Sequence, residues 1–256
     1  MSKPLILVSN DDGITSLGIR TLVEVMSEIG EVVVVAPDSP QSGMGHAITI
    51  GDPLRLKKSD IFGSIEAYEC SGTPADCVKL GKHYVLKGRT ANLVVSGINH
   101  GSNSSISVLY SGTMSAAMEA AIEQIPSIGF SLRDFAPNAD FSHTKTYIKN
   151  IAEQVLKNGL EKGTALNVNF PAKSDEAIKG IKICRQANGK WQEEFDKRKD
   201  PYGRSYFWMD GYFVNFDEDK TDTDEWALAN NYVSIVPCQY DMTAYNSIKN
   251  LEQWQF

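Results

Sequence analysis

The stretch LILVSNDDG, residues 5–13, decides the fold class. Its first half is a continuous apolar run that ends in a polar turn, which is typical of a strand buried on both faces of a parallel sheet. Leu17–Ile29 follows with an apolar stripe at helical spacing, and Gly30 ends it as a helix C-cap does. Glu31–Ala36 then contains four consecutive valines, a β-branched run that fits a second buried strand. Strand, helix and strand in this order indicate a parallel α/β unit.

The same alternation continues to about residue 173. Further buried strands are predicted at Asn92–Ser96, Ser127–Ser131 and Ala165–Asn169, and helices at Pro74–Leu80, Thr113–Glu123 and Lys145–Leu156. Right-handed crossovers between parallel strands cover both faces of such a sheet. We therefore predict an α/β fold whose sheet is mostly parallel and carries helices on both faces.

The pattern changes beyond Lys173. Strand-like pieces remain at Gly180–Arg185, Tyr206–Met209 and Val233–Val236, and two charge-rich stretches separate them, Gln192–Arg204 and Asp217–Glu225. We expect residues 1–173 to form the main domain and residues 174–256 a smaller β-rich C-terminal extension.

Composition and charge exclude several classes of protein. The chain has 256 residues, with 25 Lys and Arg against 32 Asp and Glu, a formal net charge of −7. A net acidic chain is a poor general binder of nucleic acid or of an anionic membrane. Its apolar runs are far shorter than the ~20 residues of a membrane helix, and its N-terminus has no signal-peptide h-region. The four cysteines lack C-x-x-C spacing, so we expect reduced thiols in a cytoplasmic protein.

Polar loops follow the predicted strands and are the candidate ligand site. Ligands of open α/β sheets bind at the carboxyl ends of the strands. The loops collected on this basis are Asn10–Gly13, Pro37–Gly43, Gly97–Asn103 and Leu109–Thr113. They hold carboxylates, amides, hydroxyls and glycines, and no lysine or arginine. We expect them to share one edge of the sheet.

Asp11 and Asp12 are the sharpest feature of these loops. Two adjacent carboxylates repel each other and raise each other's pKa, and a divalent cation would relieve that repulsion. Ser42 and Asn99 could add the neutral oxygens that suit Mg²⁺, Mn²⁺ or Ca²⁺. The alternative is an Asx-turn with Gly13 and no metal. The shared edge with three other polar loops favours the metal site.

Ser111-Gly112-Thr113 precedes a helix of small residues. A helix N-terminus offers free N–H groups and the positive end of the dipole, which suits a phosphate. Either hydroxyl residue could instead be an ordinary N-cap. Asn103 could add an amide donor from the neighbouring glycine-rich loop. Because these loops lack basic residues, the charge of a bound phosphate would be met largely by the metal.

Other motifs in the sequence give weaker evidence about function. Gly43–Ile48 begins like a dinucleotide fingerprint but ends in isoleucine and does not join a strand to a helix, so that function is rejected. His46 and His100 lie near the candidate loops, although a histidine in such a place is more often an ordinary loop residue. The cysteines show no zinc-ligand spacing.

Several longer motifs carry a family resemblance. They are SNDDGI (9–14), VVAPDSPQSGMGHAITI (34–50), SGTPADCV (71–78), SGINHGSN (96–103), YSGTMSAAMEA (110–120), IPSIGFSL (125–132), LNVNFP (166–171), DTD (222–224) and YVSIVP (232–237). With these motifs in the expected order over nearly the whole chain, the sequence resembles the stationary-phase survival protein SurE family.

The resemblance implies a Rossmann-like catalytic domain and a C-terminal β extension used in dimerisation, often with swapped elements. It also implies a metal-dependent phosphatase, a 5′-nucleotidase, acting on nucleoside 5′-monophosphates, often on 3′-monophosphates and in some members on short polyphosphate. One Mg²⁺ or Mn²⁺ per subunit and a homodimer or tetramer are expected, with no stable nucleic-acid or membrane partner. The implied metal ligands are Asp11, Asp12, Ser42 and Asn99; the phosphate contacts are Asn103, Ser111, Gly112 and Thr113; the catalytic residues are Asp11, Asp12 and Asn99.

The expected chemistry is metal-assisted hydrolysis, with water attacking phosphorus in line with the leaving ribose oxygen. Asp12 is a candidate to orient or deprotonate that water, and His100 is a candidate general acid. A phosphatase with an aspartyl-phosphate intermediate is one alternative, but it normally has its second Asp two residues on and a lysine in a later loop. A nucleotide sensor without catalysis is the other. The determinants of base preference are open and include Met44, Tyr110 and the extension.

Overall fold

The computed structural model of the protein describes residues 3–255. A nine-stranded sheet forms its centre, in the order β3-β4-β2-β1-β5-β6-β7-β11-β8. The parallel inner strands are β1 (Leu5–Ser9), β2 (Glu31–Pro37), β5 (Leu93–His100), β6 (Ser127–Leu132) and β7 (Thr164–Phe170). Because β2 and β5 flank β1 on opposite sides, the topological switch point lies between β1 and its neighbours.

Four further strands complete the sheet at its two sides. They are β3 (Leu56–Ser59), β4 (Glu66–Cys70), β8 (Ile181–Ile183) and β11 (Val233–Gln239). β4 runs parallel to β2 and β8 parallel to β11, whereas β3 is antiparallel to β4 and β11 antiparallel to β7. The sheet is therefore mostly parallel, as predicted, with an antiparallel pair near each side.

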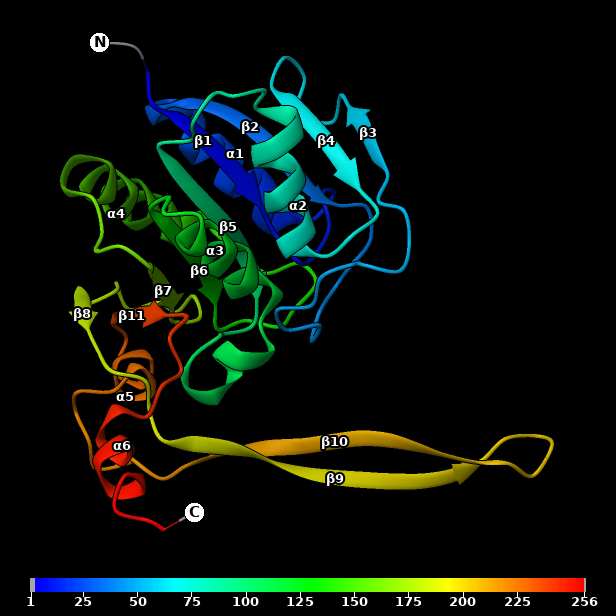
Figure 1. The fold of residues 1–256 in the computed structure, drawn as a ribbon, viewed down its shortest axis with the longest axis vertical. Coiled ribbons are helices and arrows are strands. Elements are labelled where there is room, and N and C mark those ends of the chain that lie inside the picture. The colour runs from blue at the N-terminus through cyan, green and yellow to red at the C-terminus, as the bar shows by residue number, and fades with distance from the viewer. Residues whose placement is uncertain (1–2, 256) are drawn as a thin grey trace.

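Helices cover both faces of the sheet, which confirms the predicted fold class (Figure 1). α1 (Leu17–Ile29) packs with α4 (Lys145–Asn158), and α2 (Pro74–Leu80) packs with α3 (Gly112–Ile122). Strand residues alternate between two hydrophobic clusters, so that Ile6 and Val8 join one and Leu5 and Leu7 the other. Short helical turns lie at Gly81–Val85, Ser105–Tyr110 and Ser142–Thr144.

Local sequence signals explain where two of the helices begin and end. Thr73 and Asp76 form a capping box at the start of α2, and Pro74 occupies its first turn. α1 ends at Gly30, whose backbone is extended. A Cβ there would lie 2.6 Å from the Ile6 side chain, so close packing on β1 requires this glycine.

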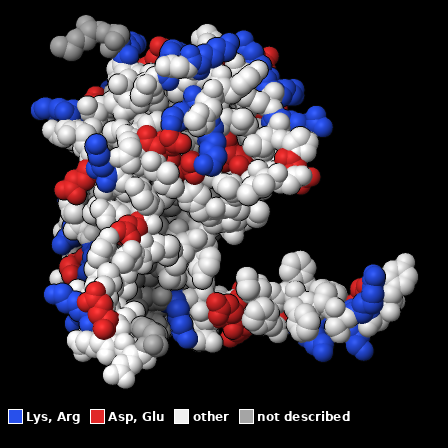
Figure 2. All heavy atoms as spheres, viewed as in Figure 1, with Lys and Arg blue, Asp and Glu red and all other residues white. Residues whose placement is uncertain are grey.

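A long hairpin leaves the body of the protein. Within the described residues 3–255, β9 (Gly189–Lys199) and β10 (Ser205–Asn215) pair only with each other, and they project as an arm (Figures 1 and 2). We expected Gln192–Arg204 to separate strands, and this was wrong, because most of it belongs to β9. The predicted strand at Tyr206–Met209 lies within β10. Both faces of the arm meet solvent, so β9 shows no alternation of apolar and polar residues that would reveal it.

The C-terminal segment returns to the body after the arm. It forms α5 (Asp224–Ala229), the sheet strand β11 and finally α6 (Tyr245–Leu251), which has no buried residue. The predicted domain boundary after residue 173 stays a prediction. Within residues 3–255, no helix has the length and apolar character needed to cross a membrane.

Candidate active site

The loop after β1 brings three of the predicted loops together at Asp11. Asp11 is almost completely buried, and its Oδ1 accepts a hydrogen bond from the Thr113 hydroxyl at 2.5 Å. Its main-chain oxygen accepts from the Gln41 amide at 2.7 Å. The start of α3 and the loop after β2 therefore both touch the end of β1, as the shared edge predicted.

The loop after β5 supplies the next contacts. The His100 amide donates to Asp12 Oδ2 at 3.2 Å, and Asn99 Nδ2 donates to the Gly101 carbonyl at 2.7 Å. Since the nitrogen of the Asn99 amide is used inside its own loop, its oxygen remains as the acceptor. Ser42 is exposed in a turn directly after Gln41, which the Asp11 contact holds at this edge.

The two aspartates lie in an environment short of positive charge. Burial and, to a lesser degree, the neighbouring charge of Asp12 together raise the pKa of Asp11 to about 6, against the opposing hydrogen bonds from Thr113. Burial also raises the pKa of Asp12. A cation beside both carboxylates would stabilise their ionised forms.

The donor set fits a hard divalent cation. Within residues 3–255, no group of three or more His, Cys, Asp and Glu side chains is arranged to hold a metal. A cation here would rest on two carboxylates, Asp11 and Asp12, together with neutral oxygens from Ser42 and Asn99. Oxygen donors of this kind suit Mg²⁺ or Mn²⁺ and do not suit a thiolate-binding or imidazole-binding metal.

The start of α3 packs directly against the acid pair. A Cβ on Gly112 would lie 2.6 Å from Asp11 Cβ and 2.9 Å from Asp11 Oδ2, so only glycine allows this approach. The Ser111 hydroxyl accepts from the Met114 amide at 3.0 Å and is the N-cap of the helix. Thr113 directs its hydroxyl to Asp11. With the Met114 N–H taken up by this cap, the main-chain N–H groups of Gly112 and Thr113 are the first-turn donors without a helical acceptor, and such groups can bind an anion.

Asn103 is buried and fixed by strands β6 and β7. Its amide N–H donates to Asn169 Oδ1 at 2.7 Å, its Nδ2 donates to the Ser131 hydroxyl at 2.8 Å, and its carbonyl accepts from Asn167 Nδ2 at 2.8 Å. One of its two side-chain N–H groups is thus left for another acceptor. Sequence reasoning missed Ser131, Asn167 and Asn169 as supports, and polar residues inside buried strands were the available signal.

Sequence reasoning also missed a cation at this edge. Arg133 directly follows β6, in a loop that was not among those collected for the site. Its guanidinium lies 3.6 Å from the carboxylate of Glu225, and Glu225 also accepts from the Ser104 hydroxyl. The signal was available in the sequence, since Arg133 follows a predicted buried strand.

The two histidines contact neighbouring segments. His100 Nδ1 lies 3.0 Å from the Ala136 carbonyl, which can only accept, so this nitrogen carries the proton in that contact. His46 Nε2 lies 3.0 Å from a carboxylate oxygen of the buried Glu119 on α3, and Lys79 Nζ lies 2.5 Å from the other. His46 thereby ties the loop that carries Ser42 to the helix that begins at Gly112.

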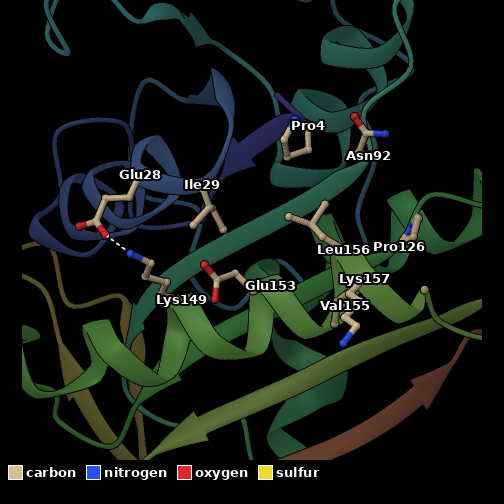
Figure 3. A pocket seen from close by; sticks show the side chains of 11 residues that line it. Pro4, Glu28, Ile29, Asn92, Pro126, Lys149, Glu153, Val155, Leu156 and Lys157 are labelled. Carbon is tan, nitrogen blue, oxygen red and sulfur yellow. Dashed lines mark hydrogen bonds and ion pairs between the residues drawn. The ribbon is translucent and has the colours of Figure 1, made fainter. Parts of the chain in front are cut away.

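A hollow of about 530 Å³ lies at the other edge of the sheet (Figure 3). Pro4, Asn92 and Pro126 line it from the positions just before β1, β5 and β6. None of the predicted site residues contributes to it. The candidate site is therefore the set of contacts around Asp11 at the carboxyl edge.

The fold and this edge define a class: a Rossmann-like α/β protein with an acid pair and a helix N-terminus at the switch point of its sheet. The family model described as "Survival protein SurE" matches residues 6–193. The chain belongs to the SurE family, which confirms the resemblance drawn from its motifs.

Individual relatives agree over the full length. The chain is 70% identical to the "5'-nucleotidase SurE" of Cytophaga hutchinsonii, over 100% of this chain and 99% of that protein. It is 63% identical to the protein of the same name from Christiangramia forsetii, over 98% and 97%. The crystal structure of the SurE protein from Aquifex aeolicus superposes with a TM-score of 0.83 at 40% identity, covering 97% of this chain and 98% of that one.

Proposed function

We propose that the protein is a metal-dependent 5′-nucleotidase that hydrolyses nucleoside 5′-monophosphates to nucleoside and phosphate. One observation carries the proposal: the buried Asp11 carboxylate packs against the first turn of α3, through the Thr113 hydroxyl at 2.5 Å and the close approach of Gly112. A cation-binding acid pair and an anion-binding helix start are thus adjacent, as a phosphate monoester bound to a metal requires. The names of the two relatives support the same reaction.

Each group has a distinct task in this reaction. A divalent cation, Mg²⁺ or Mn²⁺, held by Asp11, Asp12, Ser42 and Asn99 would supply positive charge to the phosphate and make water more acidic. The first turn of α3 binds the phosphate oxygens and stabilises the charge they gain in the transition state. Asp12 is half-buried, accepts a hydrogen bond from the His100 amide, and is the carboxylate we assign to orienting the attacking water.

A covalent aspartyl-phosphate is the competing mechanism. Asp11 is a poor nucleophile for it, since burial encloses the carboxylate and Thr113 already donates to Oδ1. Phosphoenzyme trapped after acid quenching would favour the covalent mechanism. A stable nucleotide complex without phosphate release would favour a sensor.

We also propose that the protein assembles through its arm, as a homodimer or tetramer, and works in the cytoplasm. Aromatic side chains on β10 stay exposed although a soluble chain normally covers such residues, which supports a second copy as the partner. All four cysteines are free thiols, which suits a reducing compartment.

Phosphate release is the test of the reaction. Protein stripped with EDTA is assayed with a panel of 5′- and 3′-nucleoside monophosphates and tripolyphosphate, before and after Mg²⁺ or Mn²⁺ is restored. We expect release from the 5′-monophosphates only with metal, and the panel then ranks the bases. Folded protein that releases no phosphate with either metal would contradict the proposal.

A further inference from the structure

The face of β6 that carries Arg133 is the face that supports the phosphate-binding residues. A Cβ on Gly129 would lie 3.5 Å from the side chain of Thr113, at the start of α3. Two residues further along, the Ser131 hydroxyl accepts from Asn103 at 2.8 Å. Alternate residues of a strand share one face, so Arg133 is the next position on this face toward the carboxyl edge.

The chain bends at Arg133, where the Asp134 amide donates to the Leu132 carbonyl at 2.7 Å, but the strand pairing extends to the Arg133 amide. The Arg133 amide still donates to the Phe170 carbonyl of β7 at 2.9 Å, in continuation of the ladder in which Leu132 is paired with Phe170. Its side-chain contact agrees, since Glu225 reaches both Arg133 and Ser104, the residue next to Asn103. Arg133 thus lies about 7 Å along the strand from Ser131, beyond the Asn103 contact.

The guanidinium is available to a ligand. The Arg133 side chain is 41% exposed, and within residues 3–255 its one charged partner is Glu225, at 3.6 Å. Glu225 is 11% exposed and is fixed from the other side by Ser104. A single ion pair of that length leaves the planar donor fork of the arginine free to bind an anion with two parallel hydrogen bonds.

We propose that Arg133 is a substrate-contacting residue that binds a phosphoryl oxygen on the side of the site away from the acid pair, with Glu225 as its orienting partner. The inference rests on the proposed function and adds to it a cation that the four collected loops lack. The group that Arg133 would bind is a phosphoryl anion. Its source is either the phosphate of the monoester itself or a second phosphoryl group of a longer substrate.

Charge balance is the physical reason for this assignment. A phosphate monoester is a dianion near neutral pH, and the main-chain dipoles of α3 compensate it only in part. An arginine that contacts the phosphate in both the bound substrate and the transition state strengthens binding more than it speeds turnover. Loss of this arginine is therefore expected to raise KM and to weaken the binding of inorganic phosphate.

The experiment uses Arg133→Gln and Arg133→Lys, with Arg89→Gln as the matched control. The Arg89 side chain is similarly exposed, at 43%, and pairs with Glu31 and Glu66 away from the site. Calorimetry measures the Kd of inorganic phosphate for the Mn²⁺-loaded protein, and spin resonance measures the Kd of Mn²⁺. We expect Arg133→Gln to weaken phosphate about 10- to 100-fold, Arg133→Lys less, and Arg89→Gln not at all. Mn²⁺ affinity should stay within about twofold of wild type.

Glu225→Gln should change the phosphate affinity in the opposite direction. The amide oxygen still accepts from Ser104, but the negative charge that competes for Arg133 is gone, so phosphate should bind more tightly than in the wild type. KM for a nucleoside monophosphate and for tripolyphosphate distinguishes the two sources. A rise in both KM values in Arg133→Gln assigns the contact to the reacting phosphate, and a rise for tripolyphosphate alone assigns it to a second group.

Two outcomes would overturn the inference. One is wild-type phosphate affinity in Arg133→Gln. The other is an equal loss of phosphate and Mn²⁺ affinity, which would mark a structural effect. Wild-type protein that binds phosphate through Arg133 but cleaves no nucleotide would keep the inference and refute the proposed nucleotidase instead.

Discussion

The carboxyl edge of the sheet buries polar side chains, whereas the β9–β10 arm exposes apolar ones. At the edge, polar side chains such as Asp11 and Asn103 are buried, and each is held by hydrogen bonds from the same chain. On the arm, large apolar side chains such as Trp208 (60% exposed) and Met209 (70%) face solvent. At the edge, the polar side chains find their partners within the chain, whereas on the arm the large side chains of Trp208 and Met209 remain mostly exposed to solvent.

The strands of the arm also have fewer stabilising neighbours than the inner strands of the sheet. β9 and β10 pair only with each other, and an isolated two-stranded ribbon is marginally stable in water. β1, in contrast, lies between two parallel neighbours and under helices on both faces. Changes at the edge should therefore alter chemistry within one chain, and changes on the arm should alter assembly.

Asp12→Asn at the carboxyl edge should have the largest effect on activity. The substitution keeps the size of the side chain and removes its charge, so the cation loses a ligand and water loses its orienting carboxylate. We expect kcat to fall by about 1,000-fold or more while the thermal unfolding midpoint of the metal-free protein is preserved. Steady-state phosphate release and a circular dichroism melt measure the two quantities. Activity close to wild type would refute the metal-site assignment.

Gly112→Ala tests the packing of α3 on the acid pair. The new Cβ would meet Asp11 at 2.6 Å, and the carboxylate or the helix start must shift. A displacement of this size should reduce kcat/KM about 100-fold. Gly51→Ala is the control, since a Cβ there meets open space. Equal kinetics for the two variants would show that the close approach is not needed.

Asp11→Asn tests the electrostatics of the edge through stability. The pKa of Asp11 is about 6 in the folded protein against 3.8 for the free group, so the folded state holds the proton more tightly. The metal-free protein therefore loses stability as the pH rises from about 4 to 6, by an amount on the order of 3 kcal/mol above that range. Asp11→Asn should remove this loss.

The measurement is urea unfolding in EDTA at pH 4 and pH 7.5. We expect the variant to be more stable than the wild type at pH 7.5 and nearly equal to it at low pH, with no stabilisation by Mn²⁺. A variant that is less stable than the wild type at pH 7.5 would contradict the assigned repulsion.

Trp208→Ser together with Met209→Ser tests the arm and should have the smallest effect on turnover. Removing exposed apolar surface should shift the protein toward smaller assemblies, measured by light scattering across a range of concentrations. We expect kcat per chain to stay within about threefold of wild type. Tyr202→Ser, at the tip of the arm, serves as the control. A wild-type protein that is monomeric at every concentration would remove the basis of the comparison.

The same contrast explains what the sequence could predict. The inner strands and the helices around them were predicted to within two residues at each end, except that β5 continues to His100, four residues beyond the predicted end at Ser96. Burial on both faces makes a strand such as Leu5–Ser9 uniformly apolar, which explains this agreement. The common edge followed from topology alone, since parallel strands end on the same side. This is why Asp11 and Thr113, far apart in sequence, were expected to be near each other.

Other features had no local signal. β9 and the short β3 have mostly exposed residues, so no pattern of burial marks them. The supports of Asn103 come from β7, and Arg133 meets Glu225 only because the C-terminal segment returns to the sheet. Such pairings between distant segments depend on the tertiary structure, and a reading of neighbouring residues does not reveal them.

The late return of the chain has a consequence for its synthesis. β8 joins the sheet only through β11, and β11 is made after the whole arm. As the protein leaves the ribosome, β7 remains an open edge until β11 emerges. Asp224 and Glu225, which hold the Ser104–Ser105 segment, also arrive late. A nascent chain thus carries its acid pair and the helix proposed to bind phosphate long before Asp224 and Glu225, so the site is complete only after the arm and this segment have been made.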